Sequence, residues 1–146
     1  MLERLRQSWG QSATVVAAGR RHDLAKLPAL VALLDEEPVG IATYLVDGDG
    51  CELVTLDAFV RRCGVGSALL EGVVAEARKR RCRRLWLITT NDNLNALRFY
   101  QRRGLQLVAL RRGAVARARE LKPEIPAVGA EGIVIQDEIE LELALR

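Results

Sequence analysis

A change in hydrophobic period near residue 61 constrains the fold of this chain more than any other feature. Residues 51–59 suit a β-strand, whereas the following apolar side chains recur at helical spacing, at Val65, Leu69, Val73 and Ala77. The sequence Arg-Arg-Cys-Gly-Val-Gly-Ser at 61–67 joins the two. Glycines there let the backbone approach a ligand, and the free N–H groups of a helix's first turn favour an anion. The pattern therefore predicts a strand, a turn and a helix that can hold a phosphate.

Two familiar nucleotide-binding patterns do not fit this junction. It has no third glycine at the spacing of dinucleotide-binding folds, and no Lys-Ser or Lys-Thr pair of the kind a P-loop requires. A plain strand-to-helix turn would also explain the glycines. The junction alone therefore does not define a ligand.

Strands and helices are predicted on both sides of this unit. Before it, short apolar runs predict strands at 13–18, 29–34 and 40–46, with a hairpin turn at 47–50. After it, the patterns predict a strand at 85–90, a helix at 93–103, and strands at 105–110 and 137–145. In the last strand, Ile139 and Leu141 alternate with Glu138 and Glu140, which predicts one packed and one solvated face. The expected fold class is α/β (α+β).

The bulk composition fits one soluble domain covering residues 1–146. Apolar residues make up 49% and charged residues 28%, and no apolar run is long enough to cross a membrane, so a cytoplasmic protein is expected. Cys51, Cys63 and Cys82 match no zinc or disulfide pattern, so we expect free thiols and no metal. The net charge of +3 suits an anionic ligand.

The predicted helix at 93–103 carries a second pattern. Asn93 and Tyr100 lie two turns apart and almost in register, with Ala96 between them on nearly the same face. Gly104 follows, where a helix commonly ends. The stripe places an amide, a small side chain and a phenol in one line, although Tyr100 on its own could equally be a half-buried core residue.

In their order, and with a strand between them, the two patterns resemble those of the GNAT acetyltransferase superfamily. They read Arg-x-x-Gly-x-Gly and Asn-x-x-Ala-x-x-x-Tyr-x-x-x-Gly in this chain, within residues 52–110. The resemblance implies a mixed, mostly antiparallel sheet that splays between its fourth and fifth strands. It also implies acetyl-CoA as co-substrate, with its pantetheine arm in the gap between those strands.

The resemblance assigns a role to each matching residue. The main chain of Val54, Thr55 and Leu56 would pair with pantetheine. The pyrophosphate would be held by backbone amides of the junction, namely those of Arg61, Arg62, Cys63, Gly64, Val65, Gly66 and Ser67. Asn93 and Ala96 would contact the cofactor, and Tyr100 would lie near its sulfur.

Transfer of an acetyl group to an amine requires an acid and a base. A thiolate leaving group has a pKa of roughly 8.5 and can take a proton from a phenol, so Tyr100 is the candidate general acid. Glu52 is the candidate base, because some family members have a glutamate near this point and the residue shares a strand face with Val54 and Leu56. A solvated Glu52 and a basic His22, the one histidine, remain alternatives.

The N-terminal region departs from the family pattern. Family members usually have two helices between the first and second strands, whereas here only residues 19–27 are available. We therefore expect residues 111–136, with a short helix at 114–121 and a Pro/Gly-rich stretch, to form one wall of the acceptor pocket instead.

The acceptor itself is not defined by the sequence. A small-molecule or peptide amine is expected, and a homodimer is compatible with the chain. Two other classes compete: a non-catalytic sensor that binds acyl-CoA, and a nucleic-acid binder suggested by the basic run at 78–84. Because no aromatic residue interrupts that run, we expect neither nucleic acid nor membrane as a partner.

Overall fold

The structure is a computed structural model that describes residues 2–10, 13–60 and 64–146. Arg61, Arg62 and Cys63, three of the predicted cofactor-binding residues, lie outside the described residues. The elements of the described chain, in order, are α1 (Leu2–Trp9), β1 (Thr14–Ala17), β2 (Arg20–Asp23), the short 3-10 helix η1 (Leu24–Lys26), β3 (Ala29–Leu34), β4 (Glu37–Asp47), β5 (Gly50–Ala58), α2 (Val65–Lys79), β6 (Arg84–Thr90), α3 (Leu94–Arg102), β7 (Gln106–Arg111), α4 (Ala114–Leu121), the 3-10 helix η2 (Ala130–Gly132) and β8 (Glu138–Ala144).

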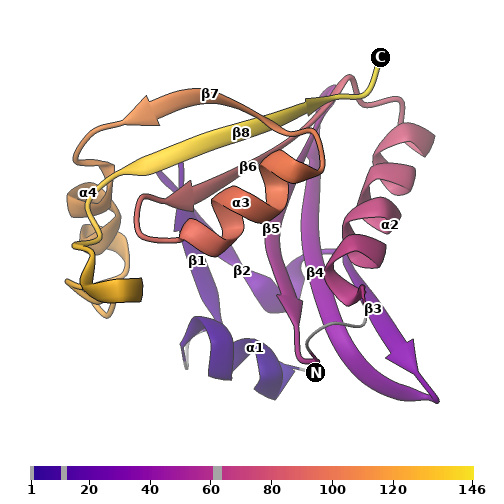
Figure 1. Cartoon of the computed structure of the whole chain (residues 1–146), viewed down its shortest axis with the longest axis horizontal. Helices are drawn as coiled ribbons and strands as arrows, with labels where there is room; N and C mark the ends of the chain where they lie inside the picture. The colour runs from indigo at the N-terminus through magenta and orange to yellow at the C-terminus, as the bar shows by residue number, and fades with distance from the viewer. Residues whose placement is uncertain (1, 11–12, 61–63) are drawn as a thin grey trace.

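The main sheet has the strand order β3-β4-β5-β6-β8-β7 (Figure 1). All of its neighbouring strands are antiparallel except β5 and β6, which run parallel. Within the described residues, β5 and β6 pair only at their first residues, from Gly50 opposite Arg84 to Glu52 opposite Trp86. Since β5 continues to Ala58, the two strands diverge after Glu52. The predicted mixed, mostly antiparallel sheet that splays between these strands is confirmed.

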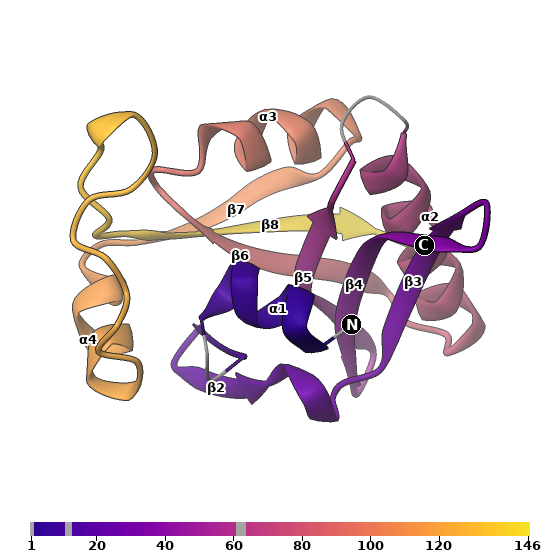
Figure 2. The same ribbon diagram turned by 90° about the horizontal axis from the view of Figure 1, so that it is seen from below.

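Two apolar cores cover the two faces of this sheet. Figure 2 shows α3 on one side of the sheet, and α1 with the β1–β2 hairpin on the other. The larger core joins α2 and α3 to the sheet through fully buried side chains such as Val73, Leu85 and Leu141. The smaller core joins α1 and the hairpin to the opposite face through Leu5 and Val15. Helices α2 and α3 and the N-terminal segment therefore lie on opposite faces of the sheet.

The N-terminal segment differs from the prediction in three ways. The predicted strand at 13–18 is present as β1, but it pairs with β2 in a separate two-stranded sheet instead of joining the main one. The α1 helix was not predicted, because a charged eight-residue segment carries too little apolar pattern to stand out. The β2 sequence, Arg-Arg-His-Asp, has no strand pattern either and is extended because it pairs with β1.

The prediction of a solvated glutamate face on β8 is wrong. Glu138 and Glu140 are buried, at 3% and 7% exposure. Arg84 and Arg111 bind Glu140 at 3.2 and 2.6 Å, and one Glu138 oxygen accepts a hydrogen bond from the backbone N–H of Ala18. Burial raises the pKa of Glu138 above its usual value. A strand pattern identifies the polar face but does not reveal that Ala18 of the hairpin contacts Glu138 or that two arginines pair with Glu140.

Candidate active site

The divergence of β5 and β6 forms a V whose vertex is at Glu52. This residue faces Leu45 on β4 and Trp86 on β6, and it is the last residue of β5 that pairs with β6 in the described chain. Beyond it, the edge of β5 that faces β6 has no strand beside it among the described residues. Such an edge presents main-chain N–H and C=O groups to a ligand that can pair like a strand.

A β-bulge lies at the start of this open edge. Thr43 faces Thr55 while its neighbour Tyr44 faces Leu53, so Val54 is an extra residue on β5. The Thr43 and Thr55 hydroxyls are buried and hydrogen-bonded at 2.6 Å. A bulge reverses the alternation of side chains beyond it.

The bulge corrects one prediction about strand faces. Val54 belongs to the smaller core, but Leu56 packs against the larger one. Leu56 therefore does not share a face with Val54, and the expectation that Glu52, Val54 and Leu56 lie on one face is wrong. Simple alternation along the strand cannot reveal the extra residue.

The start of α2 lies just after the open end of β5. Gly64 precedes the helix in a left-handed conformation, with φ of 67° and no side-chain cap. The first-turn N–H groups of Val65, Gly66 and Ser67 have no partner within the helix by its geometry. A Cβ on Gly66 would lie 3.2 Å from the Phe99 ring, so this glycine allows α2 and α3 to approach closely. The N–H groups of this first turn can therefore bind an anion.

On α3, the predicted line of three residues is present and runs from solvent to core. Asn93 is exposed and caps the helix, its side-chain oxygen accepting from the Ala96 N–H at 3.2 Å. Ala96 is half-buried against the larger core. Tyr100 is buried at 8% exposure and meets the Phe99 ring edge-to-face, with centroids 5.2 Å apart.

The Tyr100 phenol is held in its protonated form. Burial raises its pKa well above the usual value, and the negative charge of Asp57 on β5 raises it further. Asp57 in turn accepts a hydrogen bond from the Trp9 indole at 2.7 Å, and burial raises the pKa of its own carboxyl. Asp57 and Trp9 were missed, because a single acidic residue near a strand end and a tryptophan in a charged segment give no distinctive pattern.

The structure brings the two candidate bases together. His22 on β2 and Glu52 on β5 are buried at 5% and 3% exposure, with Nε2 and Oε1 3.3 Å apart. The sequence considered them separately, since 30 positions divide them. Glu52 is therefore not the solvated residue that the sequence left open, and His22 is buried on a strand beside it.

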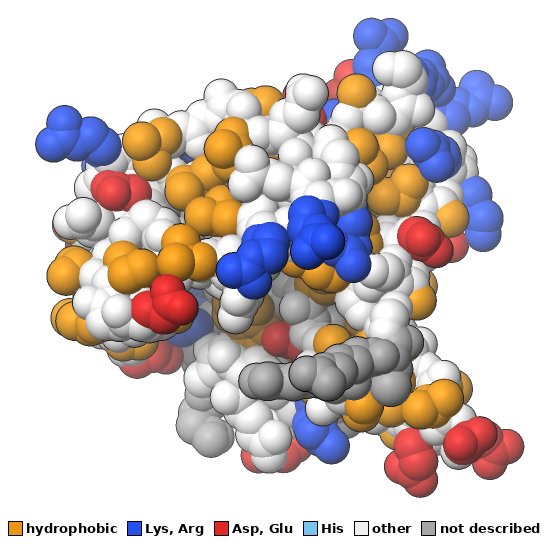
Figure 3. Space-filling view, viewed as in Figure 1, with side chains coloured by type: hydrophobic (Ala, Val, Ile, Leu, Met, Phe, Trp, Pro, Cys, Tyr) orange, Lys and Arg blue, Asp and Glu red, His pale blue; other side chains and the backbone are white. Residues whose placement is uncertain are grey.

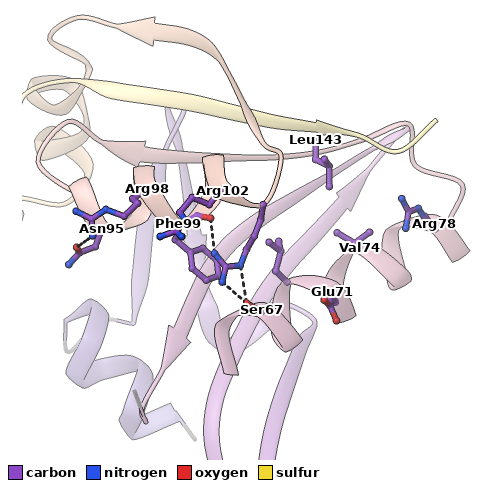
Figure 4. A pocket seen from close by; sticks show the side chains of 11 residues that line it. Ser67, Glu71, Val74, Arg78, Asn95, Arg98, Phe99, Arg102 and Leu143 are labelled. Atoms are coloured by element: carbon purple, nitrogen blue, oxygen red, sulfur yellow. Dashed lines mark hydrogen bonds between the residues drawn. The ribbon is translucent and has the colours of Figure 1, made fainter. Parts of the chain in front are cut away.

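A groove of about 960 Å³ runs between α2 and α3 (Figure 4). Ser67 and Glu71 line it from α2, and Asn95 and Arg98 from α3. Arg103 donates to the Ser67 hydroxyl from Nε at 2.9 Å and from Nη2 at 2.7 Å, which joins the end of α3 to the start of α2.

The groove is basic. Figure 3 shows a cluster of basic side chains over α3, and the arginines that line the groove are Arg78, Arg98, Arg102 and Arg103. The sequence analysis missed this group, although the closely spaced arginines of the predicted helix at 93–103 were a usable signal. Its charge favours an anionic ligand beside the start of α2.

A second cavity, of about 310 Å³, lies at the open end of the V on the side of α1. Trp9, whose indole binds Asp57 near the end of β5, and Thr90, the last residue of β6, both line it. Most of its surface is apolar, with Val15, Ile125 and Ile135 in the lining, although the charged side chains of Lys122 and Glu124 line it as well. Lys122 fixes this wall by donating to the carbonyl oxygens of Trp9 and Thr14, at 2.7 and 2.6 Å.

The described residues give no sign of a metal site, a membrane-spanning helix or a reactive cysteine. No group of three or more potential metal ligands occurs among the described residues, and no helix there is long and apolar enough to span a bilayer. Cys51 and Cys82 are free and buried, and burial raises the pKa of Cys51 to about 12. Neither thiol is therefore activated as a nucleophile.

A splayed mixed sheet with a helix start at its open end defines an acyltransferase-type α/β fold. The profile of the Acetyltransferase (GNAT) family matches residues 2–105. The chain belongs to this family, and the resemblance seen in its sequence is confirmed. An acetyltransferase from Bacillus subtilis, solved in complex with CoA, shares the fold with a TM-score of 0.72 and 21% identity, over 84% of this chain and 80% of that one.

Two relatives from Bacillus subtilis (strain 168) are closer in sequence. The uncharacterized protein YdhI is 50% identical over 103 residues, which cover 70% of this chain and 64% of YdhI. The uncharacterized protein YxbD is 40% identical over 132 residues, which cover 90% of this chain and 82% of YxbD. The chain thus spans less than two thirds of the length of YdhI.

Proposed function

We propose that this chain, acting as one acyltransferase domain, is an acetyl-CoA-dependent N-acetyltransferase that transfers an acetyl group to a primary amine within a ternary complex. The observation that carries the proposal is the V between β5 and β6, with the buried carboxylate of Glu52 at its vertex and the start of α2 at its open end. Membership of an acetyltransferase family and the fold shared with a CoA-bound acetyltransferase support it.

In this proposal, acetyl-CoA occupies the V and the surface next to it. The main chain of Val54, Thr55 and Leu56 pairs with pantetheine along the open edge of β5. The N–H groups at the start of α2 bind the pyrophosphate, and Asn93 and Ala96 contact the cofactor from α3. The basic groove between α2 and α3 then lies where the charged nucleotide end can reach it.

This assignment predicts a ligand-specific stabilisation. Acetyl-CoA at about 100 times its Kd should raise the melting temperature by roughly 5 to 10 °C, because a ligand that binds only the folded state stabilises it. NAD and ATP, whose fingerprints the sequence lacks, should not. Thermal unfolding followed by circular dichroism measures the shift, and an unchanged melting temperature in millimolar acetyl-CoA would contradict the cofactor assignment.

Glu52 and Tyr100 supply the proton transfers. Glu52 takes the proton that the amine loses when its nitrogen forms the C–N bond with the acetyl carbon. As the C–S bond breaks, Tyr100 gives its phenolic proton to the departing sulfur, and both residues then exchange protons with solvent. The phenol carries this proton at neutral pH, as any tyrosine does. Burial of both residues excludes water from the reacting atoms.

We assign the cavity of about 310 Å³ beside Trp9 to the acceptor amine. It opens on the face of the sheet opposite α2 and α3, so amine and thioester can meet inside the V from two sides. One wall of it consists of Lys122, Glu124, Ile125, Pro126 and Ile135, which supports the expectation that segment 111–136 replaces the absent N-terminal helices. Its small volume and apolar lining favour a compact apolar amine over a polyamine.

Filling this cavity should impair the acceptor alone. We expect Ile125→Trp to raise the KM for the amine about tenfold or more, because the larger side chain occupies space that the acceptor needs, while the KM for acetyl-CoA stays unchanged. Kinetics of CoA release with each substrate varied in turn measure both constants.

Val128→Trp is the matched control, because Val128 lies in the same segment but is 51% exposed. Its kinetic constants should equal those of the wild type. An Ile125→Trp enzyme that is folded and has an unchanged KM for the amine would place the acceptor elsewhere. Point substitution is preferable to deletion of the segment, because α4 contributes the buried Val115 to the fold.

A further inference from the structure

The contact between His22 and Glu52 links the N-terminal hairpin to the vertex of the V. His22 lies on β2 opposite Val15, and its ring reaches the main sheet, where Nε2 is 3.3 Å from Oε1 of Glu52. The two side chains are at least nineteen-twentieths buried. The hairpin occupies the chain segment where the family pattern has helices, so this contact is a property of this chain's own N-terminal region.

The two facing atoms are close but not hydrogen-bonded. Their orientation does not meet hydrogen-bond geometry, and neither atom has another hydrogen-bond partner within the part of the chain that the structure describes. An unsatisfied buried polar atom costs about 1–3 kcal/mol of stability, so a contact with a purely structural role would be expected to close. This cost in stability is explained if the two side chains form their hydrogen bond only when a proton or a ligand arrives.

Among the described residues, His22 is the one charged or polar side chain found to contact the Glu52 carboxylate. Its neighbours on β4 and β6 are Leu45 and Trp86, neither of which carries a charge. Arg84, two residues before Trp86, is bound to Glu140 and Glu142. The imidazole of His22 is therefore the group that can set the direction of the Glu52 carboxylate.

We infer that His22 is the positioning residue of the catalytic base. When the pair closes, the Nε2–H of His22 donates to Oε1 of Glu52 and fixes the carboxylate, so that Oε2 can accept the proton of the acceptor amine. This inference rests on the proposed function, in which Glu52 is the base. It extends that function because the β1–β2 hairpin then takes part in catalysis. Its residue His22 contacts the base Glu52 and does not contact the substrates.

The chain offers an uncommon way to test the contact, because His22 is its one histidine. In a ¹H–¹⁵N spectrum of the imidazole, all signals belong to this ring, and their shifts report which nitrogen carries the proton. We expect the Nε2–H form in the wild type and a change in its signals in Glu52→Gln. Identical imidazole spectra in the two folded proteins would overturn the inference, whether or not an acceptor is known.

A pair of substitutions separates positioning from packing. Gln at position 22 places an N–H donor near that of Nε2, whereas Leu fills similar space without a donor. With an identified amine, His22→Leu should lower kcat about 10- to 100-fold, the usual loss when an orienting hydrogen bond is removed, with the KM for acetyl-CoA unchanged. His22→Gln should retain most of the activity.

The outcomes distinguish this inference from the proposed function. Equal kcat losses in the Leu and Gln variants, or no loss in either, would show that His22 has a packing role only and would overturn the inference. The proposed function fails separately, if acetyl-CoA neither stabilises the wild type nor reacts with any amine.

Discussion

Tyr100→Phe should reduce kcat about 100- to 10,000-fold while changing the affinity for acetyl-CoA little, because a general acid acts in the transition state. The substitution removes the hydroxyl but keeps a ring that still packs edge-to-face against Phe99. The phenol is protonated at neutral pH, so it carries the proton that the departing thiolate, with a pKa of roughly 8.5, takes up. Burial and the charge of Asp57 raise the pKa of the phenol, which makes it a weaker acid, so the transfer depends on the position of the hydroxyl next to the sulfur. CoA release at saturating amine measures kcat.

The second tyrosine of the chain provides the matched control. Tyr44 on β4 is also buried, at 6% exposure, and burial raises its pKa as well. It packs within the larger core opposite Leu53, and the proposed mechanism gives it no proton to transfer. Tyr44→Phe should therefore keep near wild-type kcat. If Tyr100→Phe also kept it, with chemistry as the slow step, the assignment of Tyr100 as general acid would be wrong.

Gly40→Ala should give the largest loss of stability among these variants, about 1–3 kcal/mol in the free energy of unfolding. A Cβ at this position on β4 would lie 2.6 Å from Cγ1 of Val65 and 2.9 Å from the backbone oxygen of Asp57. The second contact is with a main-chain atom, so a side-chain rotation cannot relieve it. Relief of the contact with Asp57 requires β4 and β5 to shift, and relief of the contact with Val65 requires the first turn of α2 to move away from the sheet. Acetyl-CoA affinity should therefore also fall.

Gly72→Ala tests whether the effect belongs to this contact. Gly72 lies in α2, and its added Cβ would meet only the end of the Leu30 side chain, at 2.9 Å. Alanine also favours a helix over glycine by about 0.5–1 kcal/mol, so this variant should be neutral or slightly stabilised. Chemical denaturation and a cofactor titration compare the two. Equal stabilities would contradict the tight contact between β4 and α2.

Much of the fold could be predicted where the hydrophobic period is strong. The helix at 114–121 has the predicted bounds, and the predicted strand at 51–59 differs from β5 by one residue at each end. These segments bury one regular face, so their periodicity reports their environment. The two signature patterns also place the start of α2 and the line from Asn93 to Tyr100 correctly along the chain.

The sequence could not reveal the features that depend on contacts between distant segments. The four residues of β2 are strand only because β1 pairs with them, so their own pattern carries no signal. The bulge at Val54 depends on the register with β4. The contact between His22 and Glu52 joins two polar residues that have no periodic relation, and only the folded hairpin brings them together. The burial of the β8 glutamates could not be predicted either, because the residues that contact Glu138 and Glu140 lie in distant segments of the chain.

The short pairing of β5 with β6 has a consequence for amide hydrogen exchange. Three ladder positions join the half-sheet β3-β4-β5 to the half-sheet β6-β8-β7, and the peptide groups of β5 beyond Glu52 have an edge without a neighbouring strand in the described chain. Peptide N–H groups on such an edge exchange with deuterated solvent quickly, whereas a ligand that pairs with them slows the exchange. Slower deuterium uptake at residues 53–58 therefore reports that a ligand is bound along the open edge of β5, and the measurement does not require catalytic turnover.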